Sequence, residues 1–488
     1  IIDTSDTQKL TWTPYSDDPK IYEALCTLTL SGHPASPDAI IMDDDFRKCR
    51  PVYSIAEVNA FGKWYFDKTS RKIYVYTNGT SPLLHDIIVT KHDPDNIEFG
   101  IYAVGINYLT IYGVTVRGAG AYEIYATGKK VRIEKCTLKF SGKGGIVADG
   151  DYNEFIKNHV WGNVLLNWPR GRTWNTSGGW PMGMVAKGSY SLMRGNISHD
   201  NGGEGIGTGS FPGFNIIEDN ISYDNWSVNI YAGHQSDGTI RRNLVYCTGG
   251  EKNYALDADR LPLWSSLGKV YKRMRPEAIM IADEDYQSKV VSERNQIYNN
   301  IMIGCAKGFT YYGQAIGAGI KDVYIANNTI VLPDADNPEG VWVGIDIPYN
   351  KGNNRNTVIV NNIVYGVHSD QPLIWLKGGT NEKGIRLDNN LYFSRNYKTP
   401  FWSGDLITTK DDFPSWKNRY TQDMNNLYND PIFKNTPAEL TKGDYHLQPD
   451  SPAIGKGTNS VSSIVKEDFD LLSRSKNIPT IGAYESRN

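Results

Sequence analysis

One short apolar phrase returns along the middle of this chain and constrains the fold more than any other feature. Each copy is followed by a second phrase, in which an asparagine precedes an apolar pair. Internal repeats of roughly twenty to fifty residues are typical of solenoids, where each repeat forms one turn. The copies of the first phrase are GGIVADG (144–150), MGMVAKG (182–188), EGIGTGS (204–210), VNIYAGH (228–234) and EAIMIADE (277–284).

The second phrase sets the register of the repeat. Its shortest spacings are 22, 23, 23 and 24 residues, which is enough for three short strands and three turns. In stacked turns, asparagine side chains can hydrogen-bond along a column; the alternative is that asparagine only marks turns. The fixed position before Ile, Leu or Val favours the column, and the sequence predicts an all-β, right-handed parallel β-helix. The phrase aligns at Gly113, Cys136, Asn158, Asn196, Asn220, Asn243, Asn300, Asn328, Asn362 and Asn390.

Two longer spacings mark insertions. One lies around residues 163–180 and the other around 250–276, and each directly precedes a copy of the first phrase. We therefore expect both insertions to rise from the same edge of one face of the coil. Long loops on a minimal scaffold are usually functional, so this face is the candidate groove.

The pattern divides the chain into three parts. Residues 1–99 form an N-terminal β-rich segment, in which 62–77 alternates around a polar turn as a hairpin does. The coil is expected over 100–392. Residues 393–488 are loop-like and rich in aromatic side chains, and we expect them to cap the open end of the solenoid.

Charge and motifs exclude several classes of protein. The 51 basic and 54 acidic residues give a net charge of −3, so no strong field favours nucleic acid. The sequence contains no nucleic-acid-binding motif, no dinucleotide or phosphate-binding glycine pattern, and no apolar run long enough to span a bilayer. We expect neither a nucleic-acid partner nor a membrane span, and the oligomeric state stays open.

The five cysteines show no metal-binding spacing. Cys136, Cys247 and Cys305 fall in strand phrases and are interpreted as buried thiols, whereas Cys26 and Cys49 are candidates for a disulfide in an exported protein. The sequence begins with Ile, which predicts the removal of a signal peptide. The expected location is secreted, periplasmic or on the cell surface.

Three features carry a resemblance to a known family: the WYFD…IYVY hairpin, the asparagine-bearing coils and the closing LQPDSPAIGKG…IGAYE segment. Together they resemble the secreted right-handed β-helix proteins of the pectate-lyase-like superfamily, which include polysaccharide lyases and glycoside hydrolases. The resemblance implies the fold and a polysaccharide or oligosaccharide substrate. It does not specify the reaction, which must be argued from a site.

Strand alternation selects the candidate catalytic residues. With the Ile of each first phrase facing inward, polar side chains gather on the outer face and at the bend that follows, on turns about 4.8 Å apart. Glycoside hydrolysis needs two carboxyl groups; Glu284 is the first choice and Asp257, Asp259, Asp283 or Glu204 the second. Glu204 has the alternative of satisfying turn amides. The catalytic candidates are Glu284, Asp283, Asp257, Glu204 and His234.

The remaining candidates would bind substrate through charge, hydrogen bonds or ring stacking. Any one aromatic residue, however, more often packs against the protein than stacks on a sugar ring. The binding candidates are Lys187, Arg170, Arg172, Trp174, Trp180, Tyr231, Asp259, Arg260, Trp264, Tyr312 and Gln314.

Three functions stay open at this point. The favoured one is hydrolysis by a carboxylate pair, which requires no cofactor. The first alternative is β-elimination on a uronate-containing glycan, with Lys187, His234 and an arginine as working groups; the carboxylates of 149–151 and 283–285 are compatible with calcium without indicating it. The second is a non-catalytic glycan-binding solenoid. The acidic pairs and GHG of polygalacturonases are absent.

Overall fold

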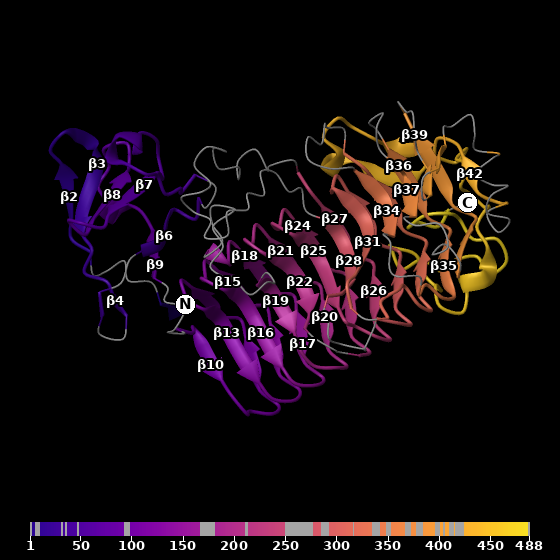
Figure 1. The fold of residues 1–488 in the computed structure, drawn as a ribbon, viewed down its shortest axis with the longest axis horizontal. Helices are drawn as coiled ribbons and strands as arrows, with labels where there is room; N and C mark the ends of the chain where they lie inside the picture. Colours follow the sequence, from indigo (N-terminus) through magenta and orange to yellow (C-terminus); the bar gives the residue numbers. More distant parts are fainter. Residues whose placement is uncertain are drawn as a thin grey trace.

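Most strands of the chain stack into three parallel sheets that together form one elongated coil (Figure 1). We number the sheets I, II and III in the order in which the chain visits them in each turn. This architecture is the predicted right-handed parallel β-helix. The computed structural model describes residues 2–4, 10–30, 33–34, 37–45, 48–91, 98–165, 181–209, 213–248, 277–284, 292–315, 317–333, 342–347, 353–366, 372–376, 384–395, 401–403, 406–408, 414 and 424–486.

Sheet I comprises β10 (Ile101–Ala103), β13 (Tyr122–Thr127), β16 (Gly144–Asp149), β19 (Met182–Ala186), β22 (Glu204–Thr208), β25 (Val228–Gly233), β28 (Glu277–Asp283), β31 (Lys307–Gly313), β34 (Val343–Ile347), β37 (Ile374–Leu376), β40 (Phe401–Ser403) and the antiparallel β41 (Leu406–Thr408). Sheet II comprises β11 (Thr110–Tyr112), β14 (Arg132–Glu134), β17 (Glu154–Ile156), β20 (Leu192–Arg194), β23 (Ile216–Glu218), β26 (Thr239–Arg241), β29 (Gln296–Tyr298), β32 (Tyr324–Ala326), β35 (Thr357–Val360) and β38 (Ile385–Asp388). Sheet III comprises β1 (Ile2–Asp3), β12 (Thr115–Arg117), β15 (Thr137–Lys139), β18 (His159–Trp161), β21 (Ile197–His199), β24 (Ile221–Tyr223), β27 (Leu244–Tyr246), β30 (Ile301–Ile303), β33 (Thr329–Val331), β36 (Ile363–Gly366), β39 (Leu391–Ser394) and β42 (Leu427–Tyr428).

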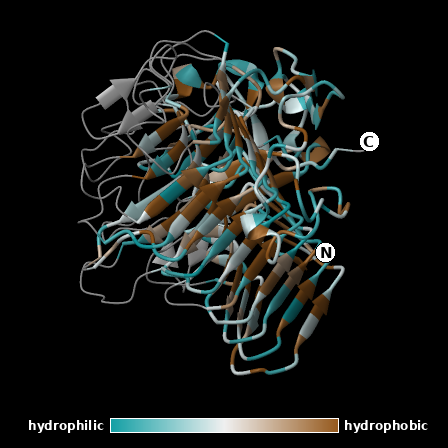
Figure 2. Cartoon of the chain, turned by 90° about the vertical axis from the view of Figure 1, so that its right-hand side faces the viewer, coloured by the Kyte–Doolittle hydropathy of each residue, from teal (hydrophilic) through white to brown (hydrophobic). Residues whose placement is uncertain are grey.

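Inward-facing side chains from all three sheets fill the coil. On sheet I, Ile206 stacks in register between Met184 and Ile230, and all three are fully buried. Hydrophobic residues recur on the strands of successive turns in the same way, as Figure 2 shows. Because strand side chains alternate between the two faces, the main core runs along the axis of the coil. The predicted inward register of sheet I is confirmed.

The predicted asparagine column lies at the corner between sheets II and III. Asn243 is typical of its members, which are buried. Its side-chain oxygen accepts hydrogen bonds from the backbone and side-chain nitrogens of Asn220, and its own amide donates to Asn300 and to the Ile217 carbonyl. The same links continue from Asn158 to Asn390, so the column is confirmed.

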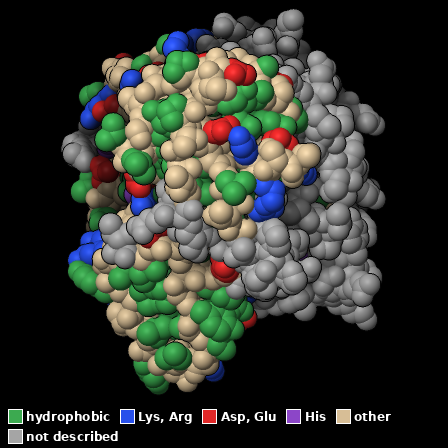
Figure 3. All heavy atoms as spheres, turned by 90° about the vertical axis from the view of Figure 1, so that its left-hand side faces the viewer, with side chains coloured by type: hydrophobic (Ala, Val, Ile, Leu, Met, Phe, Trp, Pro, Cys, Tyr) green, Lys and Arg blue, Asp and Glu red, His purple; other side chains and the backbone are tan. Residues whose placement is uncertain are grey.

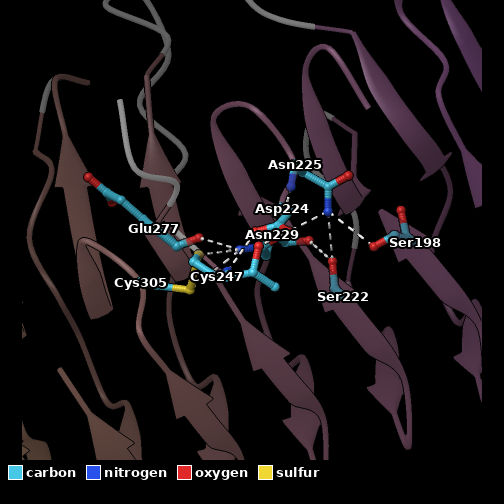
Figure 4. The surroundings of a disulfide bond; sticks show 9 residues. Ser198, Ser222, Asp224, Asn225, Asn229, Cys247, Glu277 and Cys305 are labelled. Atoms are coloured by element: carbon cyan, nitrogen blue, oxygen red, sulfur yellow. Dashed lines mark hydrogen bonds between the residues drawn. A yellow bond between two sulfur atoms is a disulfide. The ribbon is translucent and has the colours of Figure 1, made fainter. Parts of the chain in front are cut away.

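The sequence interpretation missed a second asparagine column, at the corner between sheets III and I. It passes hydrogen bonds from Asn163 to Asn201 and then to Asn225, and Asn225 bonds to Asn229 in the following strand. The amide of Asn229 lies 3.6 Å from each sulfur of a disulfide bond, which closes this column (Figure 4).

That disulfide joins Cys247 to Cys305, which corrects the interpretation of both as buried thiols. The two residues are 58 apart in sequence, but they follow β27 and β30, which are neighbours in sheet III. Stacking therefore brings them together. The predicted pairing of Cys26 with Cys49 is wrong: both are buried in the N-terminal part and neither is disulfide-bonded.

The N-terminal part forms an antiparallel sheet that contains the predicted hairpin over 62–77. Its core continues into sheet III through Phe140, so it packs against the side of the first turns. The strand β1 pairs in parallel with β12, and the first described residues thus belong to the coil. The antiparallel strands are β2 (Trp12–Tyr15), β3 (Asp18–Leu25), β8 (Lys72–Tyr76) and β7 (Trp64–Asp67), with the pairs β4 (Thr29–Leu30) with β5 (His33–Pro34) and β6 (Pro37–Met42) with β9 (Ile87–Lys91).

The described C-terminal residues 424–486 pack along the side of the last turns, and much of 393–423, which was also expected to belong to the cap, lies outside the described residues. Phe433, Tyr445 and Ile481 form one cluster with Ile301 and Ile363 on the outer face of sheet III. The coil itself continues past residue 392, because β42 pairs with β39. The short elements outside the coil are β43 (Phe433–Asn435), β44 (Asp444–Leu447) and the 3-10 helices η2 (Ile55–Glu57), η3 (Pro82–Leu84), η9 (Leu440–Lys442) and η10 (Asn459–Val461).

Both insertions lead into sheet I, because one connects β18 to β19 and the other connects β27 to β28. This places their described ends at the same edge of sheet I, as predicted. At the N-terminal end of the coil, hydrophobic side chains are frequent at the surface, among them the exposed Tyr102, Tyr108 and Tyr112 (Figure 3). Among the described residues no helix has the length and apolarity that crossing a membrane requires.

Candidate active site

The outer face of sheet I presents the first, fourth and sixth residues of its longer strands, such as β25 and β31. Val228 and Tyr231 of β25 form a small apolar cluster with Met182 and Met280, separate from the core of the coil. A side chain at Gly207 would collide with the sulfur of Met182, which shows that the first and fourth positions share this face. Glu204 occupies the first position of β22, next to Met182 in register, and it therefore faces outward as well.

Glu204 is a buried carboxyl group on this outer face. It is only 6% exposed, and its Oε2 has no hydrogen-bond partner among the described residues. Burial raises the pKa of Glu204 well above its usual value, and the charge of Glu284 adds to the increase. A carboxyl group that is hard to ionise and keeps an oxygen without a partner is poised to hold a proton and donate it.

Tyr231 of β25 lies on the strand between Glu204 of β22 and Glu284, which directly follows β28, and the charges of both carboxyl groups act on it. Its hydroxyl hydrogen-bonds to Glu284, and burial followed by the charges of Glu204 and Glu284 raises the pKa of Tyr231. Glu284 itself remains exposed to solvent. Desolvation raises the pKa of Glu284, while His234 and the Tyr231 hydroxyl oppose the increase.

His234 lies one turn from Glu284 and two from Lys187, as predicted. The backbone N–H of Glu284 donates to its Nε2 at 3.2 Å, so Nδ1 carries the proton of the neutral ring and faces Asp283 Oδ1 at 3.6 Å. The residue is buried, with a φ of 49°. These contacts hold the imidazole beneath the Glu284 backbone, where it orients Glu284.

Asp283 does not belong to the outer face, which corrects its place among the catalytic candidates. It is fully buried; Oδ1 accepts from the backbone and hydroxyl of Ser292, and Oδ2 accepts from the Tyr311 hydroxyl at 2.6 Å. The alternation that turns Ile279 and Ile281 inward also turns Asp283, the last residue of β28, into the coil, and Glu284 follows on the outside. The hydrogen bonds of Asp283 to Ser292 and Tyr311 give it a structural role at this corner of the coil.

Three predicted binding residues lie on the outer face of sheet I or at the bend that follows it. Lys187 is exposed, and a side chain at Gly209 would meet its aliphatic chain, so Lys187 lies flat over the next turn. Tyr312 is half-buried and packs with the apolar cluster of Tyr231. Gln314 is half-buried at the bend, and its backbone donates to the Asp283 carbonyl.

The other predicted residues fall in the two insertions and lie outside the described residues. They are Arg170, Arg172, Trp174, Trp180, Asp257, Asp259, Arg260 and Trp264.

The sequence interpretation missed a charged group on the same face. Lys307 of β31 lies 2.9 Å from both Glu277 and Asp346, at positions that continue the columns of Glu204 and Tyr231. Burial opposes the charge on Lys307, but the two carboxylates outweigh it and raise the pKa of the amine. The sequence does carry a signal for this charged group. The first residue of the repeated phrase is Glu204, Val228, Glu277 and Lys307 in four successive turns.

Within the described ranges, no three His, Cys, Asp or Glu side chains are grouped so that they could hold a metal ion. The sequence left calcium open as compatible but not indicated, and this question stays untested.

The pKa of Glu204 has a consequence for stability. Between its usual value of 4.5 and its higher folded value, the native state binds more protons than the unfolded state, so this group lowers stability as pH rises through that range. Glu204→Gln removes the effect. The variant should match the wild type near pH 4 and gain up to about 1.4 kcal/mol per pH unit above 4.5. Denaturant unfolding at pH 4 and pH 7 checks this; a pH-independent difference would contradict it.

Comparison with known proteins supports the fold. The family described as a right-handed β-helix region matches residues 72–245. No curated protein gives a significant match. Among solved structures, the complex of XylC with xylose is similar with a TM-score of 0.50 and 10% identity, over 99% of this chain and 87% of that one. The pectate lyase Pel9A has a TM-score of 0.43 and 12% identity, over 74% and 88%. At these identities the likeness concerns the fold.

Proposed function

We propose that this protein is a carbohydrate-active enzyme that hydrolyses glycosidic bonds on the outer face of sheet I, with Glu204 and Glu284 as its two carboxyl groups. The observation that carries the proposal is the contrast between them. Glu204 is buried with an oxygen that has no partner, and Glu284 is exposed and held by Tyr231 and His234. Pairs of titratable groups in unlike environments are typical of acid–base catalysis.

The roles follow from the environments. Glu204, which is kept protonated, gives its proton to the glycosidic oxygen as the bond to the anomeric carbon breaks and the electron pair moves to that oxygen. Glu284 either deprotonates the attacking water or attacks the anomeric carbon first, and the separation of the two groups in the substrate complex selects between these routes. Its raised pKa makes it a stronger base than an ordinary carboxylate. Lys187, Tyr312 and Gln314 would contact substrate hydroxyl groups.

We also propose that the protein works outside the reducing cytosol. The Cys247–Cys305 disulfide is the supporting observation, because structural disulfides persist in oxidising compartments.

A panel of neutral and uronate-containing polysaccharides tests the function, with reducing ends and ultraviolet absorbance followed together. Xylan is included because the similar XylC structure holds xylose. Reducing ends without absorbance are the expected result. Absorbance that rises with the reducing ends would show the new double bond of β-elimination and replace hydrolysis with the lyase alternative. Binding without any new ends would favour a non-catalytic solenoid.

Tyr231→Phe is expected to move the acidic limb of the kcat/KM–pH profile upward by about one unit. The hydroxyl hydrogen bond stabilises ionised Glu284 and lowers its pKa, and a bond to a charged group contributes about 1.5 kcal/mol. Tyr125→Phe is the matched control, because Tyr125 occupies the same strand position four turns away. An unchanged limb in Tyr231→Phe would argue against Glu284 as the base.

A further inference from the structure

A column of left-handed residues runs along the corner between sheets I and II. All have φ between 48° and 62°, a conformation that costs most residues other than glycine and asparagine about 1 kcal/mol or more. Backbone hydrogen bonds link the members from Tyr108 to Asp322 each to the next turn. The members are Tyr108, Lys130, Tyr152, Tyr190, Phe214, Asp237, Arg294, Asp322 and Asn356.

Three consecutive members of this column are exposed aromatic residues. The rings of Tyr152 and Tyr190 stack at 4.9 Å and those of Tyr190 and Phe214 at 4.8 Å, with interplanar angles of 10° and 2°. Each residue remains nearly half exposed, at 46%, 47% and 49%. The stack ends at Phe214, because the next turn supplies the shorter Asp237. One face of the Phe214 ring is therefore covered by Tyr190, and the opposite face borders an open space.

That space is an open pocket of about 610 Å³ on the outside of sheet II, lined by Phe214, Asp237, Arg294, Gln296, Asp322 and Tyr324. Arg294 forms a two-pronged ion pair with Asp237, at 2.7 and 2.8 Å, and contacts Glu293 at 3.0 Å. Asp322 is held by Arg355. The polar groups of the pocket are thus fixed in place beside the open ring face.

The charges around the pocket nearly cancel. Asp237, Asp322 and Glu293 face Arg294 and Arg355, and every one of them is in an ion pair. No uncompensated positive charge is present among these groups to attract a uronate or a phosphate. Carboxylate oxygens, the Gln296 amide and the Tyr324 hydroxyl are suitable partners for uncharged hydroxyl groups.

We propose that this pocket is a second glycan-binding site, which takes one neutral sugar ring stacked on the open face of Phe214. The apolar face of the sugar covers the Phe214 ring, and its hydroxyl groups bond to Asp237, Gln296 and Tyr324. The pocket lies on sheet II, past the carboxyl ends of the sheet I strands, where Glu284 also follows its strand; its lining includes neither Glu204 nor Glu284. It holds a polysaccharide to the enzyme independently of cleavage.

The test is the stoichiometry of binding, measured by calorimetric titration with xylotetraose, cellotetraose and mannotetraose separately. Glu204→Gln is the background, so that the probe is not consumed. One of the probes is expected to show two sites per chain in this background. Adding Phe214→Asn should weaken the second site about tenfold or more, and asparagine suits the left-handed backbone. Tyr152→Asn is the matched control, because it alters the far end of the same stack without touching the pocket; two sites should remain.

Three outcomes would overturn the proposal: no second site with any of the three probes, a second site that survives Phe214→Asn, or equal losses in Phe214→Asn and Tyr152→Asn. The hydrolysis proposal is scored by a different readout. In a chain that retains Glu204, Phe214→Asn should leave turnover of a tetrasaccharide unchanged, so that failure of the binding site and failure of the catalytic pair are distinguishable.

Discussion

Glu204→Gln is expected to lower kcat on the natural glycan about 100- to 10,000-fold, the range that a general acid contributes. Glutamine has the shape of the protonated carboxyl group and fits the same buried position, but it has no proton to give. Since the folded protein already favours the neutral form of Glu204, KM and the fold should change little.

Glu123→Gln provides the control for this prediction. Glu123 is also fully buried on sheet I with a pKa that burial raises, but it follows the first position of β13 and points into the coil, where its side chain accepts from Ala119. It should share the pH-dependent gain in stability and keep full turnover. Equal losses of turnover in both variants would mean that burial of a carboxyl group on this sheet, rather than chemistry at Glu204, explains the effect.

Removing the Cys247–Cys305 disulfide is expected to cost about 4 kcal/mol of unfolding free energy. The bond closes a loop of 58 residues in the unfolded chain, and the lost loop entropy scales with the logarithm of that length. Cys247→Ser with Cys305→Ser, compared with the wild type by denaturant unfolding without reductant, measures the difference.

Cys136→Ser is the control for the disulfide. Cys136 is a buried thiol directly before β15 and is not disulfide-bonded, so its variant reports the cost of a buried hydroxyl alone. Reductant should destabilise the wild type and leave the double variant unchanged. If reductant affects both equally, the loop entropy does not explain the stability.

The repeat made much of the fold predictable. Every turn must place its equivalent residues in the same environment, so a fixed asparagine before an apolar pair predicted the column through Asn220 and Asn243, and the Ile positions predicted the core. The same periodicity placed His234 one turn from Glu284. These inferences succeed because stacking converts sequence register directly into spatial contact.

The predictions failed where the repeat is interrupted. Cys247 and Cys305 lie on adjacent turns, but the insertion between them conceals this in the sequence. Asp283 is the last residue of β28 and continues the inward alternation of Ile279 and Ile281, so it points to Tyr311 inside the coil, whereas the sequence interpretation placed it at the outer bend. The sequence could not show whether Glu204 is buried, since nothing in it distinguishes a buried carboxyl group from an exposed turn acid. The structure shows that Glu204 is buried.

The most direct measurement compares two substrates of the same sugar, the natural glycan and an aryl glycoside whose leaving group needs no proton. A general acid matters only for the first. If Glu204 donates the proton, Glu204→Gln should lose at least 100-fold on the glycan and retain activity within about tenfold on the aryl glycoside, whereas Glu284→Gln should lose activity on both. Equal losses of Glu204→Gln on both substrates would contradict the assignment of Glu204 as the acid.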